Sequence, residues 1–98
     1  MIDTLQITDF QPYLNQDFTI HFASEASHPA QLTRVSAWST GVGNYRQPFT
    51  LEFETDMTRQ YYLQGTFTLT HPTAGDVQLF MVPIGPGAKG MRYEVVFS

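Results

Sequence analysis

Acidic side chains gather in one stretch of the chain where their spacing could support acid–base chemistry. Glu52 and Glu54 are two residues apart, and Asp56 continues the series. Alternate residues of an extended strand share a face and lie about 7 Å apart, which suits a pair of catalytic carboxylates. Nothing in the surrounding sequence marks these groups as buried, and a catalytic acid needs burial to keep its proton at neutral pH. We therefore expect a solvated strand face that discourages pairing at a sheet edge.

The three histidines, His21, His28 and His71, are the candidate metal ligands. Metal ligands have to converge on one point, and no histidine pair here has the HxH or HxxxH spacing that would bring this about. His28 and His71 each precede a proline, which favours a local role in a turn. We expect no metal site. The chain has no cysteine, which excludes disulfides, thiolate metal sites and cysteine nucleophiles.

Two glycine-rich stretches could offer backbone N–H groups to an anion. Residues 85–90 (GPGAKG) add a lysine, and residues 41–43 (GVG) form a shorter stretch. Neither matches the GxxxxGK[ST] pattern, and no predicted helix follows to receive a phosphate. No serine lies in a nucleophile elbow. We expect plain loops here, no cofactor, no catalytic residue and no enzyme activity.

Aromatic side chains near loops are better candidates for binding. Trp38 with Tyr45 and Arg46 forms one group, and Tyr61 with Tyr62 forms another. Such rings can stack on sugars or anchor a protein partner. Trp38 and one of the two tyrosines could instead close the ends of the core. The sequence leaves both interpretations open.

A β-hairpin over residues 63–83 organises the rest of the chain, with its turn at residues 71–75 (HPTAG). One register gathers the apolar side chains on a single face, and a slip by one residue would destroy that face. This register pairs Gly65 with Met81, Phe67 with Leu79, and Leu69 with Val77.

Phe80 and Val82 fall on the opposite face of this hairpin, beside threonines. If the register continues into the last strand by pairing Met81 with Tyr93, Val96 joins the same face. Apolar side chains on a solvent-facing surface are covered by another part of the chain or by a partner. We expect the chain itself to cover Val82 and a partner to cover Phe80.

Alternating apolar residues predict further strands, at residues 17–23, 49–55, 91–97 and 31–38, the last with a bulge near Thr33 and Arg34. Residues 24–29 and 84–90 are expected to be turns. One or two helical turns are expected at residues 8–15, with Asn15 in a left-handed conformation and Leu5, Phe10 and Leu14 pointing inward. The predicted fold is all-β: a small antiparallel β-sandwich or barrel of about six strands with a short N-terminal helix, in one domain spanning residues 1–98.

The charge balance disfavours two classes of partner. The chain carries 5 basic and 9 acidic residues, for a net charge of −4, so it lacks the basic face that nucleic acids or anionic membranes require. No apolar run approaches the length of a spanning helix, and the N-terminus has neither a basic start nor an apolar core. A cytoplasmic location is the default expectation, with incorporation into an exported or virion-like assembly as the other route.

Several stretches of the chain match a known pattern: residues 10–18 (FQPYLNQDF), 47–53 (QPFTLEF), 63–72 (LQGTFTLTHP), 79–83 (LFMVP) and 92–97 (RYEVVF), together with Gly75. On these stretches the chain resembles a family of small bacterial all-β domains of unknown function, often encoded near phage-tail-collar-like proteins. The resemblance covers most of the chain and consists of strand faces and turns. It implies no known activity, no cofactor and no catalytic residue, and it implies an accessory or structural part in a tail-like or surface assembly.

These observations lead to two functional expectations. The first is a non-enzymatic structural or interaction protein that binds a protein partner or itself. Its expected interface residues are Phe80, Val82, Trp38, Tyr45 and Tyr61. The alternative is a small ligand- or glycan-binding β domain that uses Trp38, Tyr45 and Arg46.

Overall fold

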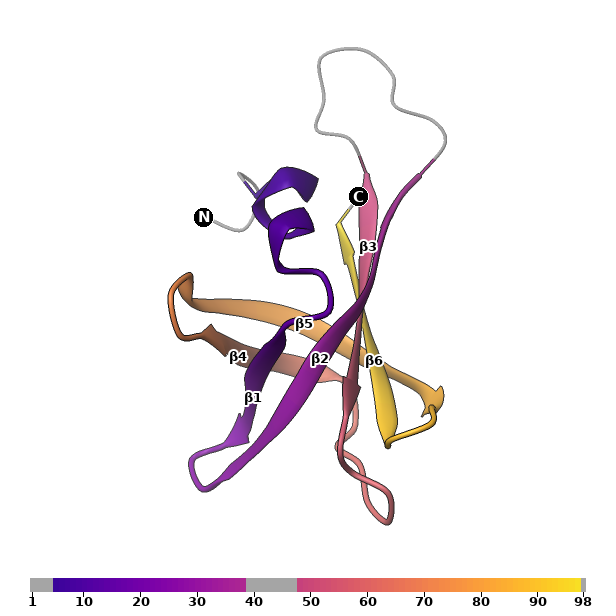
Figure 1. The fold of residues 1–98 in the computed structure, drawn as a ribbon. Helices are drawn as coiled ribbons and strands as arrows, with labels where there is room; N and C mark the ends of the chain where they lie inside the picture. Colours follow the sequence, from indigo (N-terminus) through magenta and orange to yellow (C-terminus); the bar gives the residue numbers. More distant parts are fainter. Residues whose placement is uncertain (1–4, 39–47, 98) are drawn as a thin grey trace.

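The computed structural model describes residues 5–38 and 48–97, which form a closed, six-stranded antiparallel barrel after two short 3-10 helical turns (Figure 1). The order of strands around the barrel is β1-β2-β3-β6-β5-β4. This confirms the predicted all-β class with a short N-terminal helix. The elements are η2 (Ile7–Asp9), η3 (Gln11–Tyr13), β1 (Asp17–Ala23), β2 (Ala26–Ala37), β3 (Phe49–Thr55), β4 (Gly65–His71), β5 (Gly75–Pro86) and β6 (Met91–Phe97).

The barrel consists of two groups of strands that cross at a steep angle. In Figure 1, β1, β2, β3 and β6 run upright, and the β4–β5 hairpin passes across them. Only short ladders join the groups: β1 pairs with β4 from Thr19–Thr70 to His21–Thr68, and β5 pairs with β6 from Val82–Glu94 to Pro86–Met91. This is the orthogonal way of packing two sheets, with the barrel closed at the corners.

Alternation along the strands builds the core. In β3, Phe49, Leu51 and Phe53 are fully buried, and the residues between them are partly exposed. The same period of two places Phe18 and Ile20 of β1 inside, because successive side chains of a strand point to opposite faces. Burying side chains of this size stabilises the fold by roughly 1.5–3 kcal/mol each before the cost of ordering the chain.

The β4–β5 hairpin has the register that the apolar pattern predicts, from Gly65–Met81 through Leu69–Val77 to His71–Gly75. The predicted register between β5 and β6 is wrong by two residues. Tyr93 pairs with Pro83 rather than Met81, and Val82 pairs with Glu94. Both registers keep the same residues on the inner face, so the alternation of apolar residues could not distinguish them.

Three other local expectations are wrong. The turn expected at residues 24–29 is mostly strand, because β2 begins at Ala26, and β5 continues to Pro86 through a register shift between Pro83 and Gly85. Leu14 is exposed rather than inward-facing. The bulge near Thr33 is confirmed by the register shift between Leu32 and Arg34, and Asn15 has the expected positive φ of 71°.

The N-terminal turns pack against the core at one end of the barrel. Phe10 is buried against the rings of Phe49 and Phe97, with centroids 5.9 and 5.6 Å away. The Asp9 carboxylate accepts the Gln6 N–H at 2.7 Å and so fixes the start of η2. The segment before the barrel is therefore part of the core.

Candidate functional site

The acidic residues of β3 and Asp56, which follows it, each have a partner from another part of the chain. Glu52 forms an ion pair with Arg92 of β6 at 3.2 Å, and Glu54 accepts the backbone N–H of Lys89 in the turn before β6. Asp56 accepts a hydrogen bond from His28 of β2 at 3.2 Å. The expectation that this face discourages pairing at a sheet edge is wrong, because β3 lies between β2 and β6. Asp56 is solvated as expected, with 60% of its side chain exposed.

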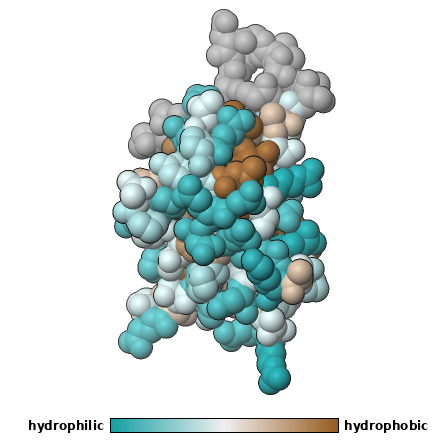
Figure 2. All heavy atoms as spheres, in the orientation of Figure 1, coloured by the Kyte–Doolittle hydropathy of each residue, from teal (hydrophilic) through white to brown (hydrophobic). Residues whose placement is uncertain are grey.

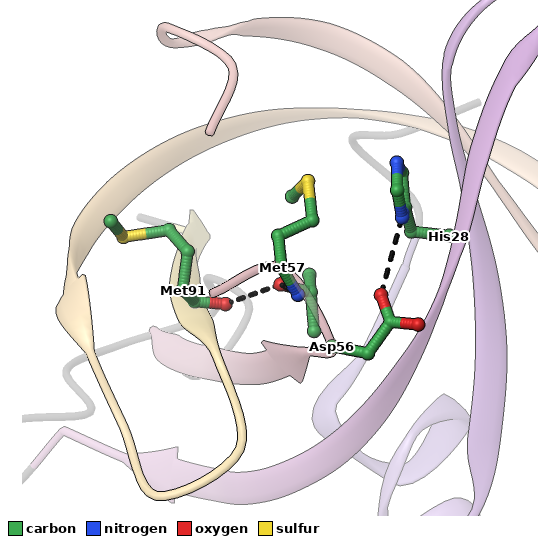
Figure 3. A network of polar contacts seen from close by, with 5 residues as sticks. His28, Asp56, Met57 and Met91 are labelled. Atoms are coloured by element: carbon green, nitrogen blue, oxygen red, sulfur yellow. Dashed lines mark hydrogen bonds and ion pairs between the residues drawn. The ribbon is translucent and has the colours of Figure 1, made fainter. Parts of the chain in front are cut away.

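We name the end of the barrel that holds Thr55, Met57, Gly90, Met91 and Tyr93 the closed end; there Thr55, Met57 and Met91 hydrogen-bond to one another. The Thr55 hydroxyl donates to the Met91 carbonyl at 2.8 Å and accepts the Met57 N–H at 3.2 Å. The Met91 N–H donates to the Met57 carbonyl at 2.8 Å. Figure 3 shows Met57 and Met91 meeting here, with the His28–Asp56 contact beside them.

Gly90 allows the two segments to approach so closely. A Cβ atom at this position would lie 2.5 Å from the Thr55 carbonyl oxygen and 2.6 Å from the Met57 nitrogen. Both atoms belong to the backbone, which has no flexible side chain to move aside. The glycine expected to lie in a plain loop is therefore a packing requirement of the closed end.

Tyr93, which is 0% exposed, fixes the connection between β3 and β4. Its hydroxyl donates to the Tyr62 carbonyl and accepts the Tyr62 N–H, both at 2.8 Å. Burial raises the pKa of Tyr93 above its ordinary value, with the hydrogen bond to Tyr62 acting in the opposite direction. Tyr62 itself stacks on Phe22 with ring centroids 4.6 Å apart, so this tyrosine of the 61–62 pair does close an end of the core.

The histidines have three separate partners: His21 contacts the Thr70 hydroxyl, His28 contacts Asp56, and His71 contacts Gln16. Within residues 5–38 and 48–97, no group of three or more histidine and carboxylate side chains is placed to hold a metal ion.

His71 ties the tip of the β4–β5 hairpin to the segment before β1. Its Nδ1 accepts the backbone N–H groups of Thr73 and Ala74, both at 3.2 Å. The ring proton therefore lies on Nε2, which donates to the Gln16 side-chain oxygen at 2.8 Å. The ring of Tyr13 packs on it with centroids 4.6 Å apart. A buried histidine with these partners has a structural role.

Apolar side chains remain exposed on the outside of the barrel, away from the closed end. Phe80 is 49% exposed, Val96 is 51% exposed and Trp38 is 41% exposed. The Trp38 indole N–H donates to the Thr50 hydroxyl at 2.9 Å, and Thr50 pairs with Val96 across β3 and β6. Phe80 and Val96 each stand two residues beyond the Val82–Glu94 pair on the outer face. We name Trp38, Thr50, Val96 and Phe80 the outer patch.

The strand neighbours of Thr50 and Phe80 in the outer patch carry no charge. Thr50 is flanked by Ser36 and Val96, and Phe80 pairs with Thr66. The neighbouring row, two residues along each strand, is charged: Arg34 pairs with Glu52, Glu52 with Glu94, and Glu94 with Val82. Loss of charge around exposed aromatic side chains is typical of the centre of a protein interface.

The structure places the predicted interface residues in different surroundings. Phe80 is uncovered, as expected, and Val82 is half-buried. Tyr61 is exposed on the connection between β3 and β4, apart from the outer patch in sequence and register. Tyr45 and Arg46 lie outside the described residues. Leu14, expected to point inward, and Leu63, which precedes the start of β4 at Gly65, are also exposed.

A groove of about 780 Å³ separates the N-terminal turns from the tip of the β4–β5 hairpin. Its wall and floor are largely apolar. The lining residues are Leu5, Asp9, Phe10, Tyr13, Phe18, Leu69, Ala74, Gly75, Asp76, Val77 and Gln78. We name the part of the molecule that holds this groove and the outer patch the open end.

On the face drawn in Figure 2, most of the surface is hydrophilic, and hydrophobic residues gather in its upper half, between the N-terminal turns and β2.

Comparison with protein families finds a match to a domain of unknown function (DUF6916) over residues 5–97. The chain therefore belongs to the DUF6916 family. This confirms the expected resemblance at the level of a small uncharacterised domain. Comparison with curated proteins and with solved structures gives no match. Among the described residues, no helix has the length and apolar character needed to cross a membrane.

Proposed function

We propose that this member of the DUF6916 family is a non-enzymatic interaction module that binds a protein partner, or a second copy of itself, through the outer patch. The observation that carries the proposal is Phe80, half exposed in a row of strand positions without charge. Covering a phenylalanine or a valine in an interface removes apolar surface from water at roughly 25 cal/mol per Å².

The composition of the outer patch supports a protein rather than a nucleic acid as the partner. Tryptophan is enriched among the residues that dominate binding energy, and charged side chains are depleted at interface centres. Of the five basic residues in the chain, Arg92 is held by Glu52 and Lys89 by Gln31. A phosphate backbone would need free cations in a row.

The setting that we propose for this module is an accessory subunit of a bacterial phage-tail-like or surface assembly. Its support is the resemblance of the strand and turn stretches to domains encoded near phage-tail-collar-like proteins. A subunit of an assembly needs a stable scaffold and a binding surface. The closed end fits the first requirement, and the outer patch fits the second.

The proposal is tested by photo-crosslinking in cells with benzoylphenylalanine at position 80, and at position 27 as a matched control. Ser27 is an exposed strand position in β2, away from the outer patch. We expect covalent adducts from position 80 and none from position 27. Light scattering across a concentration series then shows whether the partner is a second copy. Equal crosslinking at both positions, or none at either, would contradict the proposal.

The alternative, binding of a glycan or another small ligand, rests on Trp38 among the described residues. Its ring is accessible, which this function requires, but its N–H is already donated to Thr50. A thermal-shift screen against oligosaccharides tests it. A ligand that raises the melting temperature of the native chain but not that of Trp38→Ala would favour this alternative over the interaction module.

A further inference from the structure

One edge of β5 is left without a neighbouring strand over half of its length. Residues 75–81 pair with β4 from His71–Gly75 to Gly65–Met81. The ladder with β6 begins only at Val82, because β6 runs upright and diverges from β5 in Figure 1. Among the described residues, no strand pairs with this second edge of residues 75–81. A free strand edge presents a row of backbone N–H and C=O groups that can template another strand.

The groove runs along this same part of β5. Its lining includes the consecutive residues 75–78, so it follows the backbone of the strand and not only one of its faces. Across from them stand the side chains of Phe10 and Tyr13 from the N-terminal turns. Recognition by strand addition requires free backbone groups along a strand edge and an apolar groove beside them, and both are present here.

The charge of the groove defines the occupant further. Asp9 and Asp76 are its charged lining residues, and no basic residue lines it. One Asp9 oxygen already accepts the Gln6 N–H, which leaves negative charge at the rim. Asp76 lies on the outer face of β5, next to the inward Val77. The complementary partner therefore brings a cation next to an apolar side chain.

We propose that an extended segment of a partner protein adds as a strand to the open edge of residues 75–81 in β5. One apolar side chain enters the groove, and an adjacent lysine or arginine lies beside Asp76 and Asp9. The two positions are neighbours in the partner's sequence because successive side chains of a strand point to opposite faces. The inference rests on the proposed function and specifies how the partner is held, with Phe80 on the same strand as a further contact.

A partner segment fits this description better than a second copy of the same edge. A second copy would present the same two carboxylates and no cation, so the complementary charge would be missing.

The test is an array of nine-residue peptides in which apolar residues alternate with lysine or arginine, probed with the full chain. A second array carries glutamate in place of each basic residue. We expect binding to the basic array, a drop of at least about tenfold on the acidic array, and a drop of about fivefold with Asp76→Asn. Glu25→Gln, which removes a charge from the β1–β2 turn, is the matched control and should bind as the native chain does.

Backbone methylation of the best peptide distinguishes strand addition from side-chain binding. An N-methyl group at alternate positions removes the donors that the β5 edge would receive, so we expect binding to be lost with one methylation pattern and kept with the other. Absence of binding on both arrays, equal binding on both, or indifference to methylation would overturn the inference. If crosslinking from position 80 is still observed in any of these cases, the proposed function stands and only the strand-addition inference fails. If crosslinking from position 80 is also absent, both the proposed function and the inference fail.

Discussion

The two ends of the barrel differ in how completely their groups are satisfied. At the closed end the buried hydroxyls of Thr55 and Tyr93 each donate and accept a hydrogen bond, and Gly90 lets backbone touch backbone. At the open end, among the described residues, no strand pairs with the second edge of residues 75–81 in β5, and an apolar groove and the exposed side chains of the outer patch face solvent. The two ends therefore have different roles. Substitutions at the closed end should lower the free energy of unfolding, and substitutions at the open end should weaken binding.

The largest loss of stability is expected for Gly90→Ala at the closed end. The added Cβ would lie within 2.5–2.7 Å of three backbone atoms, so the ends of β3 and β6 must move apart, at a cost of about 3 kcal/mol. Urea unfolding followed by fluorescence measures it. Gly75→Ala at the open end is the comparison: its φ is 89° but no atom lies within 4 Å, and we expect about 1–2 kcal/mol. Equal losses at both positions would show that the close approach at Gly90 has no special cost.

Tyr93→Phe should cost about 1–3 kcal/mol, because the Tyr62 N–H and carbonyl lose their buried partner. It should also change the response to alkali. Burial raises the pKa of Tyr93 in the folded state above the ordinary value of 10.0, so folding favours the neutral phenol. That contribution is fully present below pH 10.0 and is lost as the pH rises through the higher folded-state pKa.

Unfolding measured from pH 8 to 12 should therefore show a stability loss in the native chain that is shallower in Tyr93→Phe. Tyr61→Phe, at an exposed tyrosine, serves as the control and should follow the native curve. Parallel alkaline curves for Tyr93→Phe and the native chain would exclude Tyr93 as a source of this loss.

Glu52→Gln lies between the two ends and should have a smaller effect. The pair that it forms with Arg92 is partly exposed, with 34% of the arginine side chain accessible, so we expect a loss of less than about 1 kcal/mol. Because salt screens such pairs, the difference from the native chain should shrink in 1 M sodium chloride. A loss that stays constant with salt would point to packing, and not to charge, as the contribution of this side chain.

The smallest effect on stability, and the largest on association, is expected at the open end for Phe80→Ser. Surface substitutions away from packed features usually change the free energy of unfolding by less than about 0.5 kcal/mol. Size-exclusion chromatography and crosslinking should show a loss of partner binding, with an unfolding midpoint near that of the native chain. A marked drop in that midpoint would mean that Phe80 belongs to the core, contrary to its exposure.

The features that the sequence predicts correctly are those set by neighbouring residues. The register of the β4–β5 hairpin follows from a short turn and one apolar face, and the bulge near Thr33 follows from Leu32 and Val35, which share no face in a regular strand. The exposure of Phe80 follows from the same alternation. These inferences need only the period of two within a strand.

The features that the sequence does not predict are contacts between distant residues, each made by one hydroxyl group or one close backbone approach. Tyr93 and Tyr62 are 31 residues apart, and Gly90 meets Thr55 and Met57 through its missing side chain. No periodicity marks such pairs. The error of two residues between β5 and β6 has a related cause, since Pro83 and the shift before Gly85 change the offset of the strands without changing which side chains face inward. The carboxylate partners of β3 likewise depended on the strand order.

The short ladders at the corners of the barrel also have a dynamic consequence. The β4–β5 hairpin has seven residue pairs within itself, against three with β1 and four with β6, so it can open as one unit while the upright strands stay paired. The hydrogen bond from His71 to Gln16 opposes that opening. Native-state hydrogen exchange should resolve two cooperative units, with the amides of the hairpin opening at a lower free energy than those of β2, β3 and β6. Binding a strand at the edge of β5 would bring the two units closer in stability, so the partner would rigidify the part of the barrel that it holds.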